Sequence, residues 1–427
     1  MPTPKIVVIG SSYSAAAAFN YLERSLAALR EPFDLLLLSN KNHYLNKDLL
    51  SQYLCDSCNL EDTCQWLRGI VFLRAGVSYL ESDILNIGFQ SKTIFTSKGE
   101  ISYQYLVLAP HNDLYDEPAF DKESNAFIIK NPGDVLRLRI HILSNIEKAV
   151  SENNPEAKNL LLTFSVIGTD REGIQLACSI SDFTNRLLRN HFPEIKKSFL
   201  KINLIEENNL ISINKDPFFN NRIFYNLNKR GIALLTNSHV NKIENNIITI
   251  NNKDKISSGT IILSNPKSSS ALIQKLYKTK SLDSCNVDLY LKLEGLEDVF
   301  MIGELAKCMD IREDFPKTDL FYNDQAKTCA TNICTKINNS PMKLLKSDLE
   351  INFLSLGYRN SLLECRNIHI DNVIAWFLHR MLYIFCSLSW KKKLRAFVGL
   401  ICNIFGLSEF EQMNVYELRQ KKQAIKK

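Results

Sequence analysis

The sequence predicts an α/β fold with two Rossmann-like dinucleotide-binding domains and a C-terminal amphipathic helical region that associates with a membrane. Two strand–turn–helix–strand units, far apart in the chain, are the first observation, and each has about the ~30-residue size of a mononucleotide-binding unit. The second observation is a late change in composition, where large apolar residues gather beside a run of lysines. We therefore expect two parallel sheets followed by helices that lie on an interface.

The first unit begins with an apolar run at residues 5–9, which ends at Gly10. An alanine-rich helix pattern follows, and residues 33–38 read as the next strand. Further strands are expected at residues 93–96, 101–102 and 105–109.

The second unit repeats this order. Residues 160–167 read as a strand that stops at Gly168, and a helix pattern begins at Gly173. The next strand, 199–205, closes on Glu206. We also expect a hairpin at residues 241–255, a strand and turn at 299–303, and a helix at 320–333.

The C-terminal region combines apolar faces with basic charge. Residues 372–390 place large apolar side chains on one helical face, although His379 and Arg380 interrupt them. The apolar run 396–407 is shorter than the ~20 residues that a membrane span needs. The face comprises residues 373, 374, 377, 381, 384, 385 and 388, and the basic side chains are Arg380, Lys391, Lys392, Lys393 and Arg395. This pattern favours an interfacial helix pair on anionic lipid, and the alternative is a core helix pair with a solvated basic loop.

Composition excludes several classes of protein. The chain has 427 residues, 45% hydrophobic and 23% charged, which excludes a disordered chain, a collagen-like fibre and a small disulfide scaffold. A net charge of +6 is too weak to indicate nucleic-acid binding. Only 15 residues are glycine, about half the ~7% average usage, although dinucleotide loops depend on glycine. The phosphate loops must therefore depart from the usual pattern.

The 11 cysteines are scattered, and no secretory signal precedes the first strand, so we expect a reducing cytoplasm. Cys55, Cys58 and Cys64 form the densest group. A Cys-x-x-Cys pair can be a redox couple or half of a zinc site, but no second pair has zinc-like spacing. Buried free thiols are the favoured interpretation, and we predict no metal site.

Residues 33–52, FDLLLLSNKNHYLNKDLLSQ, resemble the type II NADH dehydrogenase family, single-chain FAD enzymes that pass electrons from NADH to quinone. Further stretches resemble the family in the same order along the chain, including a Tyr-Gln-Tyr-Leu-Val-Leu-Ala segment and a Val-Phe-Met-Ile-Gly-Glu segment. These stretches are residues 103–109, 164–180, 299–304, 316–333 and 375–380. The resemblance implies an FAD-binding-type domain at 1–115 and 265–345, an NAD(H)-binding-type domain at 116–264, and the C-terminal region at 346–427.

By this resemblance, Gly10, Ser12 and Ala15 stand at the three glycine positions of the FAD phosphate loop. Ser39 replaces the acid that holds the FAD ribose, and a proline follows Ala109 where the family has threonine. The other residues expected to contact FAD are Asn40 and Lys41 at the adenosine end, Ile84 beside adenine, Ala109, and Gly303 and Glu304 at the flavin end.

The predicted NADH site keeps Gly168 and Gly173, but Asp170 stands where the family has its second glycine. A carboxylate beside a pyrophosphate is bulky and repulsive, so we expect weak NADH binding. Gln175 replaces the helix acid near nicotinamide, and Glu206 favours NADH over NADPH. On the quinone side, the family's Ala-Gln-x-Ala-x-Gln is replaced by Asp319, Leu320, Tyr322 and Asp324. The residues expected to face the quinone are Leu320, Asp324 and Gln325.

Three functions follow as hypotheses. The favoured one is a peripheral FAD-dependent oxidoreductase on the cytoplasmic face of a membrane, passing electrons from NADH to a quinone-like acceptor. Its expected partners are that acceptor and an anionic membrane surface, with a homodimer as a further option. No nucleic acid and no separate catalytic residue are expected. The alternative is a degenerate, non-catalytic paralogue that binds or regulates at a membrane. The least favoured is a disulfide reductase that uses Cys55 and Cys58.

Overall fold

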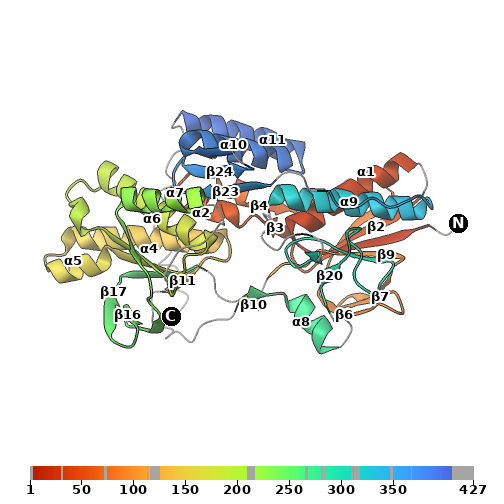
Figure 1. Ribbon diagram of the computed structural model, residues 1–427, viewed down its shortest axis with the longest axis horizontal. Helices are drawn as coiled ribbons and strands as arrows, with labels where there is room; N and C mark the ends of the chain where they lie inside the picture. Colours follow the sequence, from red (N-terminus) through yellow and green to blue (C-terminus); the bar gives the residue numbers. More distant parts are fainter. Residues whose placement is uncertain are drawn as a thin grey trace, which may run out of the picture.

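The computed structural model describes residues 3–29, 32–71, 75–112, 114–115, 126–208, 217–264, 268–279, 282, 284–308, 311, 318–346, 350–366 and 368–405. The molecule is elongated, with two sheet-containing lobes side by side and the C-terminal elements lying across their junction (Figure 1). The predicted α/β class with two parallel sheets is confirmed. Residues 406–407 of the C-terminal apolar run lie outside the described residues.

The first lobe is built on a five-stranded parallel sheet of order β21-β9-β1-β2-β5. Its strands are nearly continuous apolar runs, as expected for strands that are covered on both faces. Helices α1 (Tyr13–Leu29) and α9 (Asp319–Ile337) pack against each other beside this sheet. The strands are β1 (Lys5–Ile9), β2 (Asp34–Ser39), β5 (Val77–Glu81), β9 (Tyr105–Leu108) and β21 (Val299–Met301).

Smaller elements complete this lobe. An antiparallel meander follows β5, and α2 leads toward the second lobe (Figure 1). The meander is β6 (Ile84–Gly88), β7 (Thr93–Thr96) and β8 (Gly99–Ser102). The others are β3 (His43–Leu45), α2 (Asp48–Leu54), α3 (Leu60–Thr63), β4 (Cys64–Trp66), β10 (Leu114–Tyr115), β19 (Ser268–Ser269), α8 (Ala271–Lys278), β20 (Asn286–Val287) and β22 (Lys307–Cys308).

The second lobe repeats the architecture with a parallel sheet of order β11-β18-β12-β13-β14. The strands are β11 (Ala126–Ile128), β12 (Thr163–Ile167), β13 (Lys201–Ile205), β14 (Ile232–Leu235) and β18 (Thr260–Leu263). The helices are α4 (Pro132–Ser151), α5 (Pro155–Leu161), α6 (Arg171–Asn190), η1 (Lys197–Phe199) and α7 (Pro217–Arg230), and the meander is β15 (Val240–Glu244), β16 (Ile247–Ile250) and β17 (Asp254–Ser257).

The strand predicted at residues 160–167 starts later than expected, and the prediction was wrong for its first residues. Helix α5 extends to Leu161, and the Asn154 side chain caps its start by accepting a hydrogen bond from the Glu156 N–H at 2.9 Å. Pro155 then occupies the first helical position, where its missing N–H costs nothing. Strand β12 therefore begins at Thr163.

The sequence suggested a purely helical C-terminal region, and this prediction was wrong for its first part. A three-stranded antiparallel sheet, β23 (Ile351–Ser355), β24 (Ser361–Cys365) and β25 (Ile368–Asp371), precedes the two helices. Helices α10 (Asn372–Cys386) and α11 (Trp390–Ile404) then follow. Trp376 and Ala396 from these helices join the same buried apolar cluster as Leu49 of α2 and Phe164 of β12. The C-terminal elements are thus part of the core of the second lobe.

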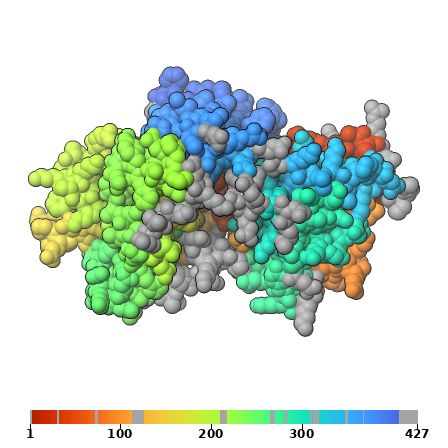
Figure 2. Space-filling model, viewed as in Figure 1, coloured from red at the N-terminus to blue at the C-terminus, as the bar shows by residue number. Residues whose placement is uncertain are grey.

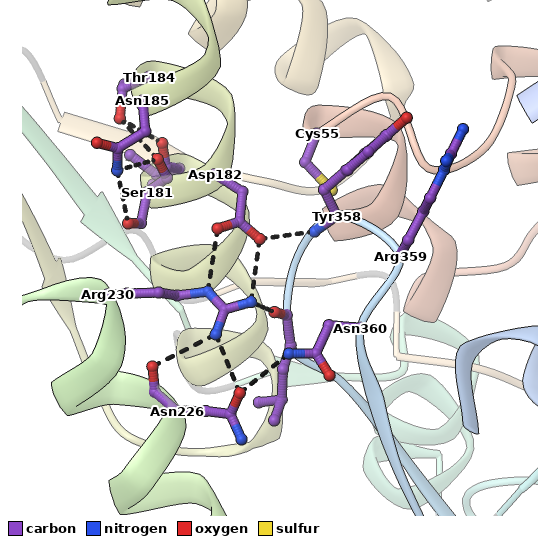
Figure 3. A network of polar contacts seen from close by, with 12 residues as sticks. Cys55, Ser181, Asp182, Thr184, Asn185, Asn226, Arg230, Tyr358, Arg359 and Asn360 are labelled. Atoms are coloured by element: carbon purple, nitrogen blue, oxygen red, sulfur yellow. Dashed lines mark hydrogen bonds and ion pairs between the residues drawn. The ribbon is translucent and has the colours of Figure 1, made fainter. Parts of the chain in front are cut away.

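An ion pair fastens the β23–β24 turn to the second lobe (Figure 3). Arg230 at the end of α7 donates from Nε and Nη2 to the two carboxylate oxygens of Asp182 on α6, each at 3.1 Å. Asp182 also accepts the N–H of Tyr358 at 2.8 Å. The adjacent Gly357 has φ +94°, and a Cβ there would lie 2.1 Å from Asp182 Oδ2. The turn therefore approaches α6 closely only because it has glycine at this position.

Candidate cofactor and acceptor site

A cavity of about 620 Å³ lies at the start of α1. Its volume falls within the range of small-molecule and cofactor sites, ~300–1,000 Å³. It is lined by Ser11, Ser12, Tyr13, Ser14, Lys41, His43, Leu45, Asn46, Lys47, Asp48, Pro110, His111, Asn112, Lys130, Asn131, Glu304, Asp319 and Tyr322. We refer to it as the cofactor cavity.

The loop between β1 and α1 forms one wall of the cofactor cavity. Gly10 has φ +144°, and a Cβ at this position would lie 2.3 Å from the carbonyl oxygen of Ala109, so only glycine fits. The Ser12 hydroxyl donates to that same oxygen at 3.0 Å and accepts the Ala15 N–H at 3.2 Å. The N–H groups of Tyr13 and Ser14 have no acceptor within the described residues. A helix start with free N–H groups favours an anion such as a phosphate.

Basic side chains lie at the same end of the cofactor cavity. His111 has Nδ1 at 3.4 Å from the Ser11 hydroxyl and Nε2 at 3.5 Å from Lys41 Nζ. Lys130, just before α4, also lines the cavity. Neither His111 nor Lys130 was predicted from the sequence, where the Pro-His pair after β9 stood out only as a loss of the family's threonine. The positive charge of Lys41 and Lys130 suits a diphosphate.

The residues predicted to bind FAD divide into three groups. Ser12, Lys41 and Glu304 line the cofactor cavity. A second group does not line it but packs beside it, since Gly10 lies against Ala109 and Ala15, and Gly303 lies against the cavity residue Ser14. Ser39, Asn40 and Ile84 do not line it. The Ser39 hydroxyl instead donates to the Lys41 carbonyl at 2.8 Å and accepts the Lys41 N–H at 3.1 Å, which closes its own turn. Ile84 offers its carbonyl oxygen to Lys275 Nζ at 3.3 Å.

Gln325 makes a positioning contact with the turn after β21, next to the cavity residue Glu304. Its side-chain oxygen accepts the Gly303 N–H at 2.8 Å, and the side chain is buried. Gln325 therefore holds the turn after β21, and neither it nor Leu320 nor Asp324 lines the cavity. Asp319 and Tyr322 of the same helix do so instead. The signal for Asp319 was present in the sequence, as an acid at the predicted start of a helix beside the predicted flavin end.

A second cavity of about 30 Å³ lies on the far side of Asp319 and is large enough only for water. It is lined by Asn46, Asp48, Leu49, Arg171, Thr318, Asp319, Phe353, His379, Leu382, Tyr383 and Cys386. Three of these residues, Asn46, Asp48 and Asp319, also line the cofactor cavity. These three residues therefore form a shared wall between the two cavities.

Burial sets the protonation of Asp319 in this wall and of His379 in the second cavity. Burial, and then the Asp48 carboxylate, raises the pKa of Asp319 to about 7, against the opposing hydrogen bond from Asn46. Burial lowers the pKa of His379 to about 4, so this ring is neutral at pH 7. His379 stacks on Phe353, with ring centroids 4.7 Å apart.

In the loop between β12 and α6, the predicted second dinucleotide loop, the Asp170 side chain occupies the start of the helix. Asp170 caps α6 by accepting the Gly173 N–H at 3.0 Å, and it also accepts the Ser264 hydroxyl at 2.7 Å. A Cβ on Gly173 would lie 2.0 Å from the Gly168 carbonyl oxygen, so glycine here permits close packing of strand and helix. The Asp170 carboxylate thus takes the place at the helix start that suits a phosphate.

The other predicted NADH residues are also engaged. Glu206 accepts hydrogen bonds from the Thr169 hydroxyl and the Asn208 N–H; burial opposes ionisation, but these bonds hold the pKa of Glu206 below its usual value. Gln175 is buried and accepts the Ser51 hydroxyl at 3.4 Å, which links α6 to α2.

Cys55 and Cys58 are buried side chains. Burial raises the pKa of Cys55 to about 11 and that of Cys58 well above its usual value. A thiol that keeps its proton is a poor nucleophile, so these residues favour packing over redox chemistry.

Helices α10 and α11 expose an apolar surface, which we call the C-terminal apolar surface. Ile374 is 65% and Phe385 73% exposed. The surface comprises Val373, Ile374, Phe377, Leu378, Phe385, Trp390, Leu394, Phe397, Val398, Ile401, Ile404 and Phe405, in the block that projects at the edge of the molecule in Figure 2. No helix within the described parts of the chain is both long and apolar enough to cross a bilayer.

Two basic residues expected on this surface point inward instead. Arg380 is 2% exposed and donates from Nη2 to Asp62 at 2.7 Å. Lys392 donates to the Cys64 carbonyl at 3.1 Å, and burial lowers its pKa to about 8. Ile384, expected on the outer face, is buried. Lys391 and Lys393 are left as the outward lysines of the predicted run.

Comparisons with known proteins agree with this architecture. The family model of pyridine nucleotide-disulphide oxidoreductase matches residues 4–326. A probable NADH dehydrogenase of Dictyostelium discoideum is 21% identical over 418 residues, covering 94% of this chain and 90% of that protein. The external alternative NAD(P)H-ubiquinone oxidoreductase B2 of Arabidopsis thaliana is 23% identical, but the match covers 74% of this chain and only 57% of that protein.

Among solved structures, NDH2 from Plasmodium falciparum in complex with RYL-552 is similar, with a TM-score of 0.75 and 19% identity. The match covers 94% of this chain and 98% of that one. At this identity the likeness establishes the fold. The resemblance stated from the sequence is confirmed.

Proposed function

We propose that this chain, which belongs to the pyridine nucleotide-disulphide oxidoreductase family, is an FAD-dependent enzyme that takes electrons from NADH and passes them to a quinone at a membrane surface. The cofactor cavity is the observation that carries the proposal. It runs from a helix start with free N–H groups to the first turn of α9. The names of the relatives, NADH dehydrogenase and NAD(P)H-ubiquinone oxidoreductase, support this direction of electron flow.

The residues of the cofactor cavity fit FAD. Because Gly10 has no Cβ, the loop can pack directly against the Ala109 carbonyl oxygen and make a tight turn. A tight turn lets a pyrophosphate approach the N–H groups of Tyr13 and Ser14. Lys41 would supply positive charge there, and His111 contacts Lys41 Nζ through Nε2 at 3.5 Å. FAD, when bound, supplies the two-electron chemistry, and the protein supplies orientation and electrostatics.

The adenosine end is the least adapted part. Ser39 spends its hydroxyl on the backbone of Lys41, so no carboxylate is offered to the ribose from the end of β2. We assign FAD to the lobe formed by residues 1–115 and 265–345. Its affinity should rest on the phosphate end and the flavin end.

We assign NADH to residues 116–264, with weak affinity because Asp170 occupies the helix start. The electron donor therefore reaches the cofactor without the phosphate contact that a glycine-rich loop gives. Glu206 keeps its charge and can still accept a ribose hydroxyl.

We place the protein on a membrane through the C-terminal apolar surface, peripherally and on the cytoplasmic face. Burying exposed apolar side chains in lipid contributes roughly 25 cal/mol per Å². Lys391 and Lys393 add attraction to anionic headgroups. A homodimer, which the sequence also suggested, stays a prediction for sedimentation analysis.

Anaerobic mixing of the flavin-loaded protein with NADH tests the proposal. Loss of the visible flavin absorbance, followed by its return when a short-chain ubiquinone is added, is the expected result. A protein that binds flavin but is not bleached by millimolar NADH contradicts it. That outcome favours the second candidate, a non-catalytic paralogue, for which the Asp170 cap in the NADH loop is the specific observation.

A further inference from the structure

Asp319 occupies a distinctive place, at the first position of α9 and in the wall shared by both cavities. Asn46 Nδ2 donates to Asp319 Oδ2 at 3.0 Å. The other carboxyl oxygen, Oδ1, has no hydrogen-bond partner within the described residues. The carboxyl is therefore fixed at one oxygen and available at the other.

Reduction of a quinone to a quinol consumes two electrons and two protons. The electrons reach the acceptor through the cofactor, but at least one proton has to come from the protein or from water. A proton donor must reach the acceptor oxygen within hydrogen-bond distance and must hold its proton near the working pH.

We propose that the Asp319 carboxylic acid donates a proton to the acceptor that is reduced in the cofactor cavity, an inference that rests on the proposed function. FAD, when bound, would supply the two electrons and one of the two protons that the acceptor needs. The acceptor's second proton comes from Asp319 Oδ1, so both carbonyl oxygens become hydroxyls. Asp319 is left as a carboxylate and recovers a proton from water, on the side where Asp48 is exposed.

The surroundings of Asp319 suit this exchange. Its position at a helix start favours the carboxylate, whereas burial and the neighbouring Asp48 favour the acid. The balance puts the pKa of Asp319 at about 7, so the acid and carboxylate forms are both populated at neutral pH. The titratable groups that face it are Asp48 of α2, Tyr13 of α1, Tyr44 of β3, Tyr322 of α9, Cys386 of α10 and Lys392 of α11.

The small cavity behind Asp319 offers a route for the returning proton. Its polar wall residues Arg171, His379 and Asp48 can hold water in a space of about 30 Å³. His379 is neutral at pH 7 because its pKa is lowered to about 4, so it can accept a hydrogen bond from such a water.

The test compares Asp319→Asn and Asp319→Glu with Lys327→Gln, which changes an exposed charge on the same helix away from both cavities. Infrared difference spectra between pH 5 and pH 9, recorded without substrate, follow the protonated-carboxyl band. Circular dichroism checks that each variant is folded. Reduced enzyme is then reoxidised by a short-chain ubiquinone, which needs protons, and by ferricyanide, which takes electrons alone.

Asp319→Asn should lose a carboxyl band that titrates near pH 7 and should be reoxidised by the quinone about 100-fold more slowly. Its rate with ferricyanide should be unchanged, Asp319→Glu should recover part of the quinone rate, and Lys327→Gln should behave as the natural protein. Burial raises the pKa of Glu172 to about 8, so the Glu172 carboxyl gives a signal in every variant, and the band of Asp319 is the difference between the natural protein and Asp319→Asn. Equal slowing with both acceptors, an unchanged quinone rate, or a titrating band of the same amplitude in both proteins overturns the donor role. A natural protein that reduces neither acceptor overturns the proposed function. This failure is distinguishable from failure of the donor role, because the carboxyl band is measured without substrate.

Discussion

The Asp170 carboxylate accepts a hydrogen bond from the Gly173 N–H at 3.0 Å, so α6 begins with an acceptor from its own chain. In dinucleotide-binding domains the corresponding N–H groups meet a pyrophosphate. Ser264 donates to the same Asp170 oxygen at 2.7 Å and holds the carboxylate in place. The loop is therefore stable without a nucleotide, at the expense of affinity for one.

Asp170→Gly should raise NADH affinity by about tenfold, which corresponds to about 1.4 kcal/mol, because it removes a charge that repels the diphosphate. Exchanging the cap for glycine should cost only a few tenths of a kcal/mol in folding stability. Isothermal titration with NADH measures the change. Asp170→Asn is the matched control, since it keeps the cap without the charge and should give an intermediate gain. Tight NADH binding in the natural protein, unimproved by either change, contradicts this explanation.

Ser12→Asp should abolish flavin retention. The side chain of residue 12 fits between the Ala109 carbonyl oxygen and the Ala15 N–H, where a carboxylate would meet the carbonyl and repel a phosphate. Ser12→Gly, which restores the family's residue, should retain flavin and serves as the control. Flavin per polypeptide after gel filtration is the measurement. Equal flavin content in the aspartate and glycine variants would place the phosphates elsewhere.

Asp182→Ala should lower the free energy of unfolding by roughly 3 kcal/mol, because it leaves the largely buried Arg230 without its carboxylate. Figure 3 shows that Asp182 also accepts the Tyr358 N–H, so the same change should free this turn. Urea unfolding measures the loss, and limited proteolysis should show earlier cleavage after residue 350. The exposed pair of Arg395 and Glu61 is the control, since Glu61→Gln should cost at most about 1 kcal/mol.

A double change of Ile374→Ser and Phe385→Ser should release the protein from vesicles, because each side chain loses roughly 1.5–3 kcal/mol of burial in lipid. Changing Lys391 and Lys393 to Gln should weaken binding to anionic vesicles by about 1 kcal/mol per lysine and reduce its salt sensitivity. Lys196→Gln with Lys197→Gln removes the same charge from exposed positions in the second lobe and should have little effect. Sedimentation with vesicles at low salt gives the answer. If the intact protein fails to sediment, the C-terminal apolar surface serves another purpose.

The sequence predicted the parallel sheets well, because strands buried on both faces are continuous apolar runs such as residues 5–9 and 34–39. The sequence could not predict ion pairs between residues that are far apart in the chain. Arg380 was expected on the surface, but its partner Asp62 lies 318 residues away in the chain. Ser39 shows the local limit, since its hydroxyl satisfies a backbone turn instead of facing a ligand.

The candidate site residues also divide into those with a local signal in the sequence and those whose role depends on distant parts of the chain. The start of α1 was predicted from Gly10, because a glycine after a buried strand has a local cause. Asp319 and His111 were missed as cavity residues, since their role depends on which elements surround them in space. Gln325 was predicted at the acceptor side, but it is committed to the Gly303 N–H.

The visible absorbance of the purified protein tests the central claim most directly. The cofactor cavity, with its helix start and basic side chains, predicts a yellow protein that carries about one FAD per chain, or an apoprotein that keeps bound FAD after incubation and gel filtration. A protein that is colourless as purified, and again colourless once unbound FAD has been removed after incubation, would contradict the assignment of this cavity to a flavin.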